Sequence, residues 1–115
     1  MVKLISLKKS DHFKLALKDK KIHTDYFSLF AIKNFIKTKT KSELIISFIM
    51  KKKIGNAVKR NKIRRKLKAI VMQLIKKKGA INKDYTYIVF GRAKAYAEKQ
   101  KVLLPEMIKC FNKIR

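Results

Sequence analysis

The sequence predicts an α/β protein, more narrowly an α+β two-layer sandwich in which helices pack on a small sheet. Apolar runs of strand length occur at 26–32, 44–50 and 85–90, and such runs are typical of buried strands. Apolar residues recur at helical spacing in other segments. The expected order is helix, strands, basic helix, strand, helix, which favours two packed layers around one core.

The N-terminal part supplies the first helix and the first strands. Ser10 can cap a short helix, because its hydroxyl can accept a hydrogen bond from a backbone amide of the first turn. An extended piece at 21–23 is a candidate edge strand. The strand at 26–32 is aromatic and apolar on both faces, and the strand at 44–50 is rich in isoleucine.

A basic helix is predicted at 58–77, after Gly55 and Asn56 break the extended pattern. Its apolar residues form one stripe at helical spacing, which would cover the sheet. The stripe consists of Ile63, Leu67, Ile70, Val71 and Leu74. Four residues fall on roughly the opposite side of this helix: Asn61, Arg65, Lys68 and Met72.

The last helix follows the strand at 85–90. Pro105 can occupy its first turn, where the missing backbone amide has no partner to lose. Alternatively, the helix starts near Ala95 and is kinked at Pro105, and the sequence leaves both starts open. Its predicted buried stripe is Leu104, Met107, Ile108 and Phe111.

Charge is the most unusual property of the chain. Its length of 115 residues predicts one domain, 1–115, and its 47% hydrophobic content indicates a folded protein. Lys and Arg number 32 against seven acids, which gives a formal net charge of +25. Because such a charge repels itself, a polyanionic partner is expected, nucleic acid first and an anionic membrane second. A generally lysine-rich proteome is the plainer alternative.

Catalytic and metal-binding chemistry find little support. The seven acids form no tight pair, none joins a histidine in a metal-ligand motif, and three glycines leave no phosphate-binding glycine loop. The single cysteine, Cys110, permits no disulfide within the chain and is interpreted as a small core residue. Neither a signal-peptide core nor an apolar run of membrane length occurs. These features predict a soluble, cytoplasmic protein that is not catalytic by itself.

Binding is better supported than catalysis. Three lysines, 51–53, follow the second long strand and lead into the basic helix. Aromatic side chains on a sheet beside such a helix could stack on the bases of a single strand. The competing interpretation places these rings in the core, since successive side chains of a strand point to opposite faces. The candidates are Phe13, Tyr26, Phe27 and Phe30.

The stretch KKKIGNAVKRNKIRRKLKAI, residues 51–70, is informative beyond its charge. It resembles the signature of the protein component of bacterial ribonuclease P, a K-K-x-G-x-A-V-x-R-N-x-x-[KR]-R-x-x-[KR] pattern that leads into a long basic helix. SLKKSDHFKLAL and KDYTYIVFGRAKA are similar to the first helix and a later strand of that family. The signature positions matched are Lys52, Lys53, Gly55, Ala57, Val58, Arg60, Asn61, Arg64, Arg65 and Lys68.

The resemblance implies a non-catalytic subunit bound to a catalytic RNA. That ribonucleoprotein removes the 5′ leader from precursor tRNA by metal-dependent hydrolysis. The implied partners are therefore the catalytic RNA and precursor tRNA, with magnesium acting through the RNA-containing holoenzyme. Neither a membrane nor an obligate protein partner is implied. The implied fold contains a left-handed βαβ crossover, an exception to the usual right-handed rule.

The resemblance also implies roles for particular residues, with no catalytic residue and no protein-bound metal among them. Phe13 and Phe30 would line a cleft for the single-stranded leader, with Lys53 supplying charge nearby. The residues that would contact RNA are Lys52, Lys53, Arg60, Asn61, Lys62, Arg64, Arg65 and Lys68. Departures from the family pattern concern mainly the lining of the cleft, and they are Leu17, Ile49, Lys51 and Ala69.

Two other classes of protein fit part of this pattern. A structural RNA-binding protein, such as a ribosomal protein, would use the same basic helix on a rigid RNA site. A membrane-surface protein is disfavoured, because the apolar stripe of the helix is needed to cover the sheet. Accessible aromatic rings distinguish a leader-binding protein from a rigid RNA binder, which need not have them.

Overall fold

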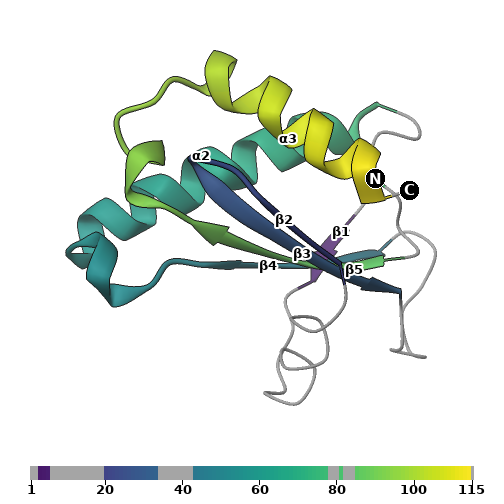
Figure 1. The fold of residues 1–115 in the computed structure, drawn as a ribbon, viewed down its shortest axis with the longest axis horizontal. Coiled ribbons are helices and arrows are strands. Elements are labelled where there is room, and N and C mark those ends of the chain that lie inside the picture. The colour runs from purple at the N-terminus through teal and green to yellow at the C-terminus, as the bar shows by residue number, and fades with distance from the viewer. Residues whose placement is uncertain (1–2, 6–19, 34–42, 78–80, 82–84, 115) are drawn as a thin grey trace.

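The computed structural model describes residues 3–5, 20–33, 43–77, 81 and 85–114 (Figure 1). The helix expected after Ser10 lies outside these residues, as do Phe13 and Leu17. The elements in chain order are β1 (Lys3–Ile5), β2 (Lys20–His23), β3 (Phe27–Lys33), β4 (Glu43–Ile49), the 3-10 turn η1 (Lys52–Ile54), α2 (Ala57–Ile75), β5 (Tyr85–Gly91), the 3-10 turn η2 (Ala93–Ala95) and α3 (Gln100–Ile114).

The strands form one five-stranded mixed sheet in the order β1-β4-β5-β3-β2. β3 pairs antiparallel with β2 and β5, whereas β4 pairs parallel with β5 and β1. Parallel pairing of β4 with β5 requires a crossover connection, which α2 supplies. The α+β class expected from the sequence is confirmed, and β2 lies at a sheet edge as predicted. The left-handed βαβ crossover that the resemblance implies stays a prediction.

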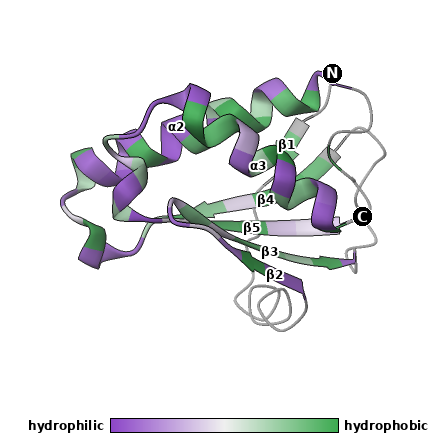
Figure 2. Cartoon of the chain, turned by 45° about the horizontal axis from the view of Figure 1, so that its top comes forward, coloured by the Kyte–Doolittle hydropathy of each residue, from purple (hydrophilic) through white to green (hydrophobic). Residues whose placement is uncertain are grey.

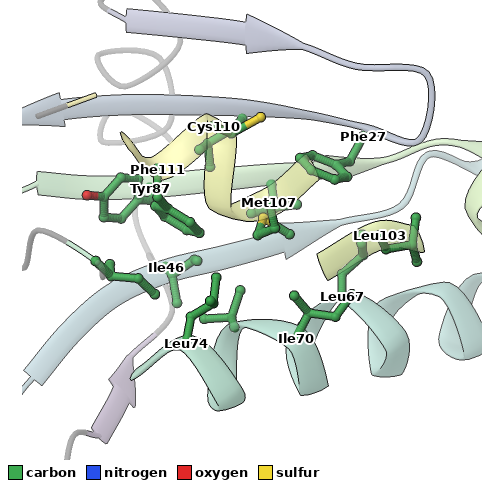
Figure 3. Packing of buried hydrophobic residues seen from close by; sticks show 14 of the residues in the cluster. Phe27, Ile46, Leu67, Ile70, Leu74, Tyr87, Leu103, Met107, Cys110 and Phe111 are labelled. Carbon is green, nitrogen blue, oxygen red and sulfur yellow. The ribbon is translucent and has the colours of Figure 1, made fainter. Parts of the chain in front are cut away.

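α2 and α3 lie together on one face of the sheet (Figure 1). Alternate residues of the central strands are buried against them, and Phe27, Leu29 and Tyr87 are 0% exposed. The ring of Tyr87 meets that of Phe111 on α3 edge-on, with centroids 5.0 Å apart (Figure 3). Burial of this apolar surface is the main force that holds the two layers together.

The buried stripe of α2 is the predicted one. Hydrophobic and hydrophilic residues follow each other in bands along the helix (Figure 2). Its five members are at most 1% exposed: Ile63, Leu67, Ile70, Val71 and Leu74. The residues predicted for the opposite side are all exposed: Asn61, Arg65, Lys68 and Met72. The helix ends at Ile75, two residues before the predicted end.

The corner between β4 and α2 is made by the two residues that the sequence indicated. Gly55 has a φ of +154°, a conformation that residues with a side chain rarely adopt. Asn56 then caps α2, because its side-chain Oδ1 accepts a hydrogen bond of 2.9 Å from the backbone amide of Lys59. This corner joins the lysines at 51–53 to the start of the basic helix.

The start of α3 differs from both expectations. The helix begins at Gln100, after the separate turn η2, so Pro105 lies inside it rather than in its first turn. Pro105 is exposed, which leaves its ring on the solvent side of the helix.

The predicted stripe of α3 is therefore wrong in part. Met107 and Phe111 are buried, but Leu104 and Ile108 are only partly so. Adjacent apolar residues such as Leu103 and Leu104 lie about 100° apart on the helix, so spacing alone does not decide which one faces the sheet. The buried set is Leu103, Met107, Cys110, Phe111 and Ile114.

Cys110 is a buried core residue, as the sequence indicated, with 2% of its surface exposed. Burial is the main cause that raises the pKa of its thiol to about 11, with a smaller contribution from the charge of Glu106. The thiol therefore stays protonated at neutral pH and behaves as a small apolar group.

Candidate nucleic-acid interface

The outer face of α2, turned away from the sheet, is an acid-free row of polar and cationic side chains. Asn61, Arg65 and Lys68 are all exposed on it, and Val58, 75% exposed, lies on the same side. The helix contains no acid at any position. Uncompensated cations along a helix are suited to phosphates, which release condensed counterions when they are neutralised.

Arg60 and Arg64 are half-buried beside this outer face. Arg64 Nη1 donates a hydrogen bond of 2.7 Å to Asn61 Oδ1, which orients its guanidinium along the helix surface. Arg60 Nε is buried, and no group in the described part of the chain accepts its hydrogen bond. A buried donor without an acceptor costs free energy, so this atom makes the placement of the Arg60 side chain unfavourable by itself.

Three lysines occupy a different flank of α2, spaced at i, i+3 and i+7, and they face the segment 95–98. The Nζ atoms of Lys59 and Lys62 lie 5.1 and 4.8 Å from the ring centroid of Tyr96. Lys66 Nζ donates hydrogen bonds to backbone carbonyls of that segment. Lys62, expected from the resemblance to contact RNA, therefore lies on the flank of α2 rather than on its outer face.

A groove of about 660 Å³ lies beside the sheet where β4 and β5 end, and η1 and the start of η2 contribute to its lining. Phe30 and Lys53, which the resemblance assigns to one cleft, both line it. Lys52 is exposed and lies outside the groove lining. Phe13, the other aromatic residue assigned to the cleft, lies outside the described residues.

The floor of the groove is assembled by the strand register. Ser28 is the Cα partner of both His23 and Phe90, and Phe90 is also the partner of Ile49. One residue from each of four adjacent strands thus lies in a single row. The ring of Phe30 lies 5.3 Å from that of Phe90 between centroids, at an interplanar angle of 55°. Together they form an aromatic surface.

One end of the groove is polar and internally hydrogen-bonded. Ser28 Oγ lies 2.8 Å from His23 Nδ1 and accepts a hydrogen bond of 3.1 Å from Arg92 Nη2. Ser28 is only 5% exposed, whereas His23 and Arg92 are exposed. The His23 ring also meets Phe30 edge-on, with centroids 5.8 Å apart. The buried hydroxyl therefore fixes two exposed polar side chains beside the aromatic floor.

Cations complete the groove on its other side. Lys51 Nζ lies 5.6 Å from the ring centroid of Phe90, and Lys51 and Lys53 both line the groove. Of the departures from the family pattern, Lys51 thus contributes charge to the groove, and Ile49 packs in a small apolar cluster with Phe30 and Phe90. Ala69 is half-buried on α2.

The four aromatic candidates for base stacking have different environments. Phe27 is wholly buried in the core, so its assignment as a stacking residue is wrong. Tyr26 is half-buried and does not line the groove. Phe30 alone, among the described candidates, lines the groove.

Sequence reasoning missed most of the groove lining, including His23, Ser28, Phe90 and Arg92. Alternation along the strand at 85–90 could have indicated that Phe90 lies on the same face as Ile88. It could not show that Phe30 lies beside Phe90 on this face, because the β3–β5 pairing joins residues far apart in the sequence. His23 and Arg92 lie at strand ends, where no periodic signal distinguishes them.

Metal ligands and membrane spans are absent from the described part of the chain. No group of three or more His, Cys, Asp or Glu side chains is placed there to hold a metal ion. Likewise, no helix in that part is long and apolar enough to cross a membrane.

The two-layer fold, the acid-free helix face and the aromatic groove define a small α+β protein of the nucleic-acid-binding class. Comparisons with known proteins narrow this class. The family model described as Ribonuclease P matches residues 1–115. The Ribonuclease P protein component of Mycoplasma mycoides subsp. mycoides is 36% identical over 89 residues, which cover 73% of this chain and 80% of that protein.

Solved structures agree on the fold. The RNase P protein from Thermotoga maritima has a TM-score of 0.74 at 22% identity, covering 96% of this chain and 98% of that one. The Staphylococcus aureus RNase P protein has a TM-score of 0.71 at 24% identity, covering 95% and 93%. The chain belongs to the family of bacterial ribonuclease P protein components. It is thus a subunit of an endoribonuclease ribonucleoprotein that acts in tRNA 5′ maturation, and it associates with ribonuclease P RNA.

Proposed function

We propose that residues 1–115 act as one RNA-binding domain with two separate surfaces. The outer face of α2, with Arg60 and Arg64 beside it, binds the catalytic RNA. The groove holds the single-stranded 5′ leader of precursor tRNA. The observation that carries this proposal is the groove itself, where the rings of Phe30 and Phe90 lie among cationic side chains.

The groove suits an unpaired strand for two physical reasons. Aromatic rings stack on bases, and such stacking is worth about 1–3 kcal/mol per base. Lys53 and Arg92 are exposed at the groove and can neutralise phosphates on either side of a stacked base. Because every base has a flat aromatic face, stacking tolerates different leader sequences, which an enzyme that processes many tRNAs requires.

The outer face of α2 suits the catalytic RNA because its cations lack acidic partners on the helix. With six phosphate contacts, the logarithm of the affinity should fall with the logarithm of salt concentration at a slope of roughly −4 to −5. Arg65→Gln and Lys68→Gln should each make this slope shallower by about 0.7–0.9. Filter binding to the catalytic RNA between low and moderate salt measures it.

Lys109→Gln is the matched control for these two variants, because Lys109 is an exposed lysine on α3 rather than on α2. It should leave the slope unchanged. A nearly flat salt dependence of the unmodified protein would remove the electrostatic basis of the proposal.

Catalysis is assigned to the RNA, and the protein holds the substrate. Cations outnumber acids by 32 to seven, and no metal-ligand group occurs among the described residues. These residues do not fit a magnesium ion, so we assign magnesium to the RNA-containing holoenzyme. A role in tRNA maturation also predicts a cytoplasmic location.

Reconstitution with the catalytic RNA of the same cell tests the proposed function. At low magnesium, cleavage of a leader-bearing tRNA should require both the protein and the RNA. Robust cleavage by the purified protein alone would overturn the assignment of catalysis to the RNA. If instead the protein had no effect on cleavage, a purely structural RNA-binding role would be the better conclusion.

A further inference from the structure

Lys66 lies in the middle of the basic helix, yet its ammonium hydrogen-bonds to backbone carbonyls of the protein itself. Its Nζ donates to Ala95 O at 3.3 Å, to Glu98 O at 2.9 Å, and also to Tyr96 O. An ammonium carries three N–H donors, so these three carbonyls use all of them. Burial, with the charge of Lys62 adding to it, lowers the pKa of Lys66. A phosphate would therefore find no free donor on this side chain.

The carbonyls that Lys66 binds belong to residues 95–98, which run from the last residue of η2 into its connection with α3. The same connection is held a second time by α2, because the ammonium groups of Lys59 and Lys62 lie over the ring of Tyr96. Three lysines of one helix flank thus fix a short segment that belongs to neither an α-helix nor a strand.

The other end of this connection lines the groove. Arg92 and Ala93 are groove residues, and η2 is a single turn in which the amide of Ala95 donates to Arg92 O at 3.0 Å. The backbone amide of Arg92 donates to Tyr26 O at 2.9 Å, and its guanidinium donates to Ser28 Oγ. One turn of chain therefore separates the carbonyl anchor of Lys66 from the polar end of the groove.

We propose that Lys66 is a positioning residue for the leader groove, acting through residues 92–98 and not through a contact with RNA. The proposal rests on the proposed function of the groove. By fixing η2 against α2, Lys66 holds Arg92 where it can meet the leader. The helix that binds the catalytic RNA thereby also sets the geometry of the surface that binds the substrate.

The test uses the holoenzyme reconstituted from the full chain and its catalytic RNA. The measured quantity is the ratio of affinities for precursor tRNA and mature tRNA, which isolates the contribution of the leader. Lys66→Met should lower this ratio by about 3- to 10-fold, which lies within the range by which mutations in residue networks modulate the coupling between sites. Lys66→Arg keeps charge and donors and should restore part of the ratio. The salt slope for the catalytic RNA should not change in either variant.

Val71→Ala is the control for general loss of stability, since Val71 is buried on α2 and takes no part in the lysine contacts that fix the connection. It should leave the ratio unchanged. An unchanged ratio in Lys66→Met, with only a lower melting temperature, would make Lys66 purely structural and overturn the proposal. A salt slope shallower by about 0.7–0.9 would instead make it an RNA contact.

Variants at Phe30 and Tyr96 separate a failure of the proposed groove function from a failure of the proposal for Lys66. Phe30→Leu tests the groove directly: if it too leaves the ratio unchanged, the groove is not the leader site and the proposed function itself fails. If Lys66→Met does not fold, Tyr96→Leu loosens the same connection and should lower the ratio, whereas Tyr96→Phe should not. A Tyr96→Leu protein with the normal ratio would also overturn the proposal.

Discussion

Phe27 and Phe30 lie three residues apart on β3 and face opposite sides of the same sheet. Phe27 is 0% exposed beneath the helices, whereas Phe30 is half-buried and lines the groove. The core face is closed by α2 and α3, and the groove face keeps rings, a buried hydroxyl and cations together. The difference teaches that side-chain parity, rather than residue type, decides whether a ring on this strand stabilises the fold or is available to a ligand.

The largest expected effect is the loss of stability when Phe27, on the core face of β3, is truncated. Phe27→Ala removes a buried ring and leaves a cavity that the two layers cannot fill, so the free energy of unfolding should fall by about 3–5 kcal/mol. Urea unfolding followed by circular dichroism measures it. A loss well below 1 kcal/mol would show that the two faces are not as different as their burial indicates.

On the groove side, Phe30→Ala should affect binding more than stability. Loss of a stacked base would weaken precursor tRNA binding by the holoenzyme by about 1–3 kcal/mol, with little change for mature tRNA. Its effect on unfolding should be smaller than that of Phe27→Ala, because the ring is only half-buried. Equal losses for the two tRNAs would mean that Phe30 has a structural role and no contact with the leader.

The smallest expected effect is a pH dependence of stability that comes from Cys110, a core residue on α3. The pKa of Cys110 is about 11 in the folded protein, above the ordinary value of 9.0. Because the unfolded thiol ionises first, the stability that the buried thiol contributes is full below pH 9 and is lost as pH rises through 11. The unfolding free energy of the unmodified protein, minus that of Cys110→Ala, should therefore fall by about 1–2 kcal/mol over this interval.

Both proteins contain the same lysines, so subtracting one unfolding free energy from the other cancels the contribution of lysine titration. Unfolding in urea at pH 8, 9, 10 and 11 supplies the data. A difference that stays constant with pH would place the thiol in contact with water and contradict its burial.

Much of the fold could be predicted because local patterns are strong where elements are long. The five-residue stripe of α2 and its cap at Asn56 follow from spacing and from the chemistry of one side chain. The stripe of α3 does not, because adjacent apolar pairs leave two possible faces and packing chooses between them. The strand β1 has only three residues, too few to form a pattern.

The site was less predictable, because its parts meet only through tertiary pairing. The resemblance gave Phe30 and Lys53, but Phe90 joins them only through the β3–β5 register. Arg92 joins them only because it follows Gly91 at the end of that pairing, where its side chain reaches Ser28. The lysines of α2 illustrate the same limit. Lys66 and Lys68 are alike in the sequence, yet one is bound to backbone carbonyls and the other is exposed.

The register of β3 limits which insertions and deletions this strand can accept. Ser28 pairs with Phe90, and Leu29 pairs with Val89, so groove residues and core residues alternate on one rigid ladder. Inserting or deleting a single residue within β3 would turn the β3 side chains beyond the change to the opposite face, moving its groove residues toward the core and its core residues toward the groove. Length changes are therefore tolerable only outside the paired residues, and the strand can vary by substitution alone.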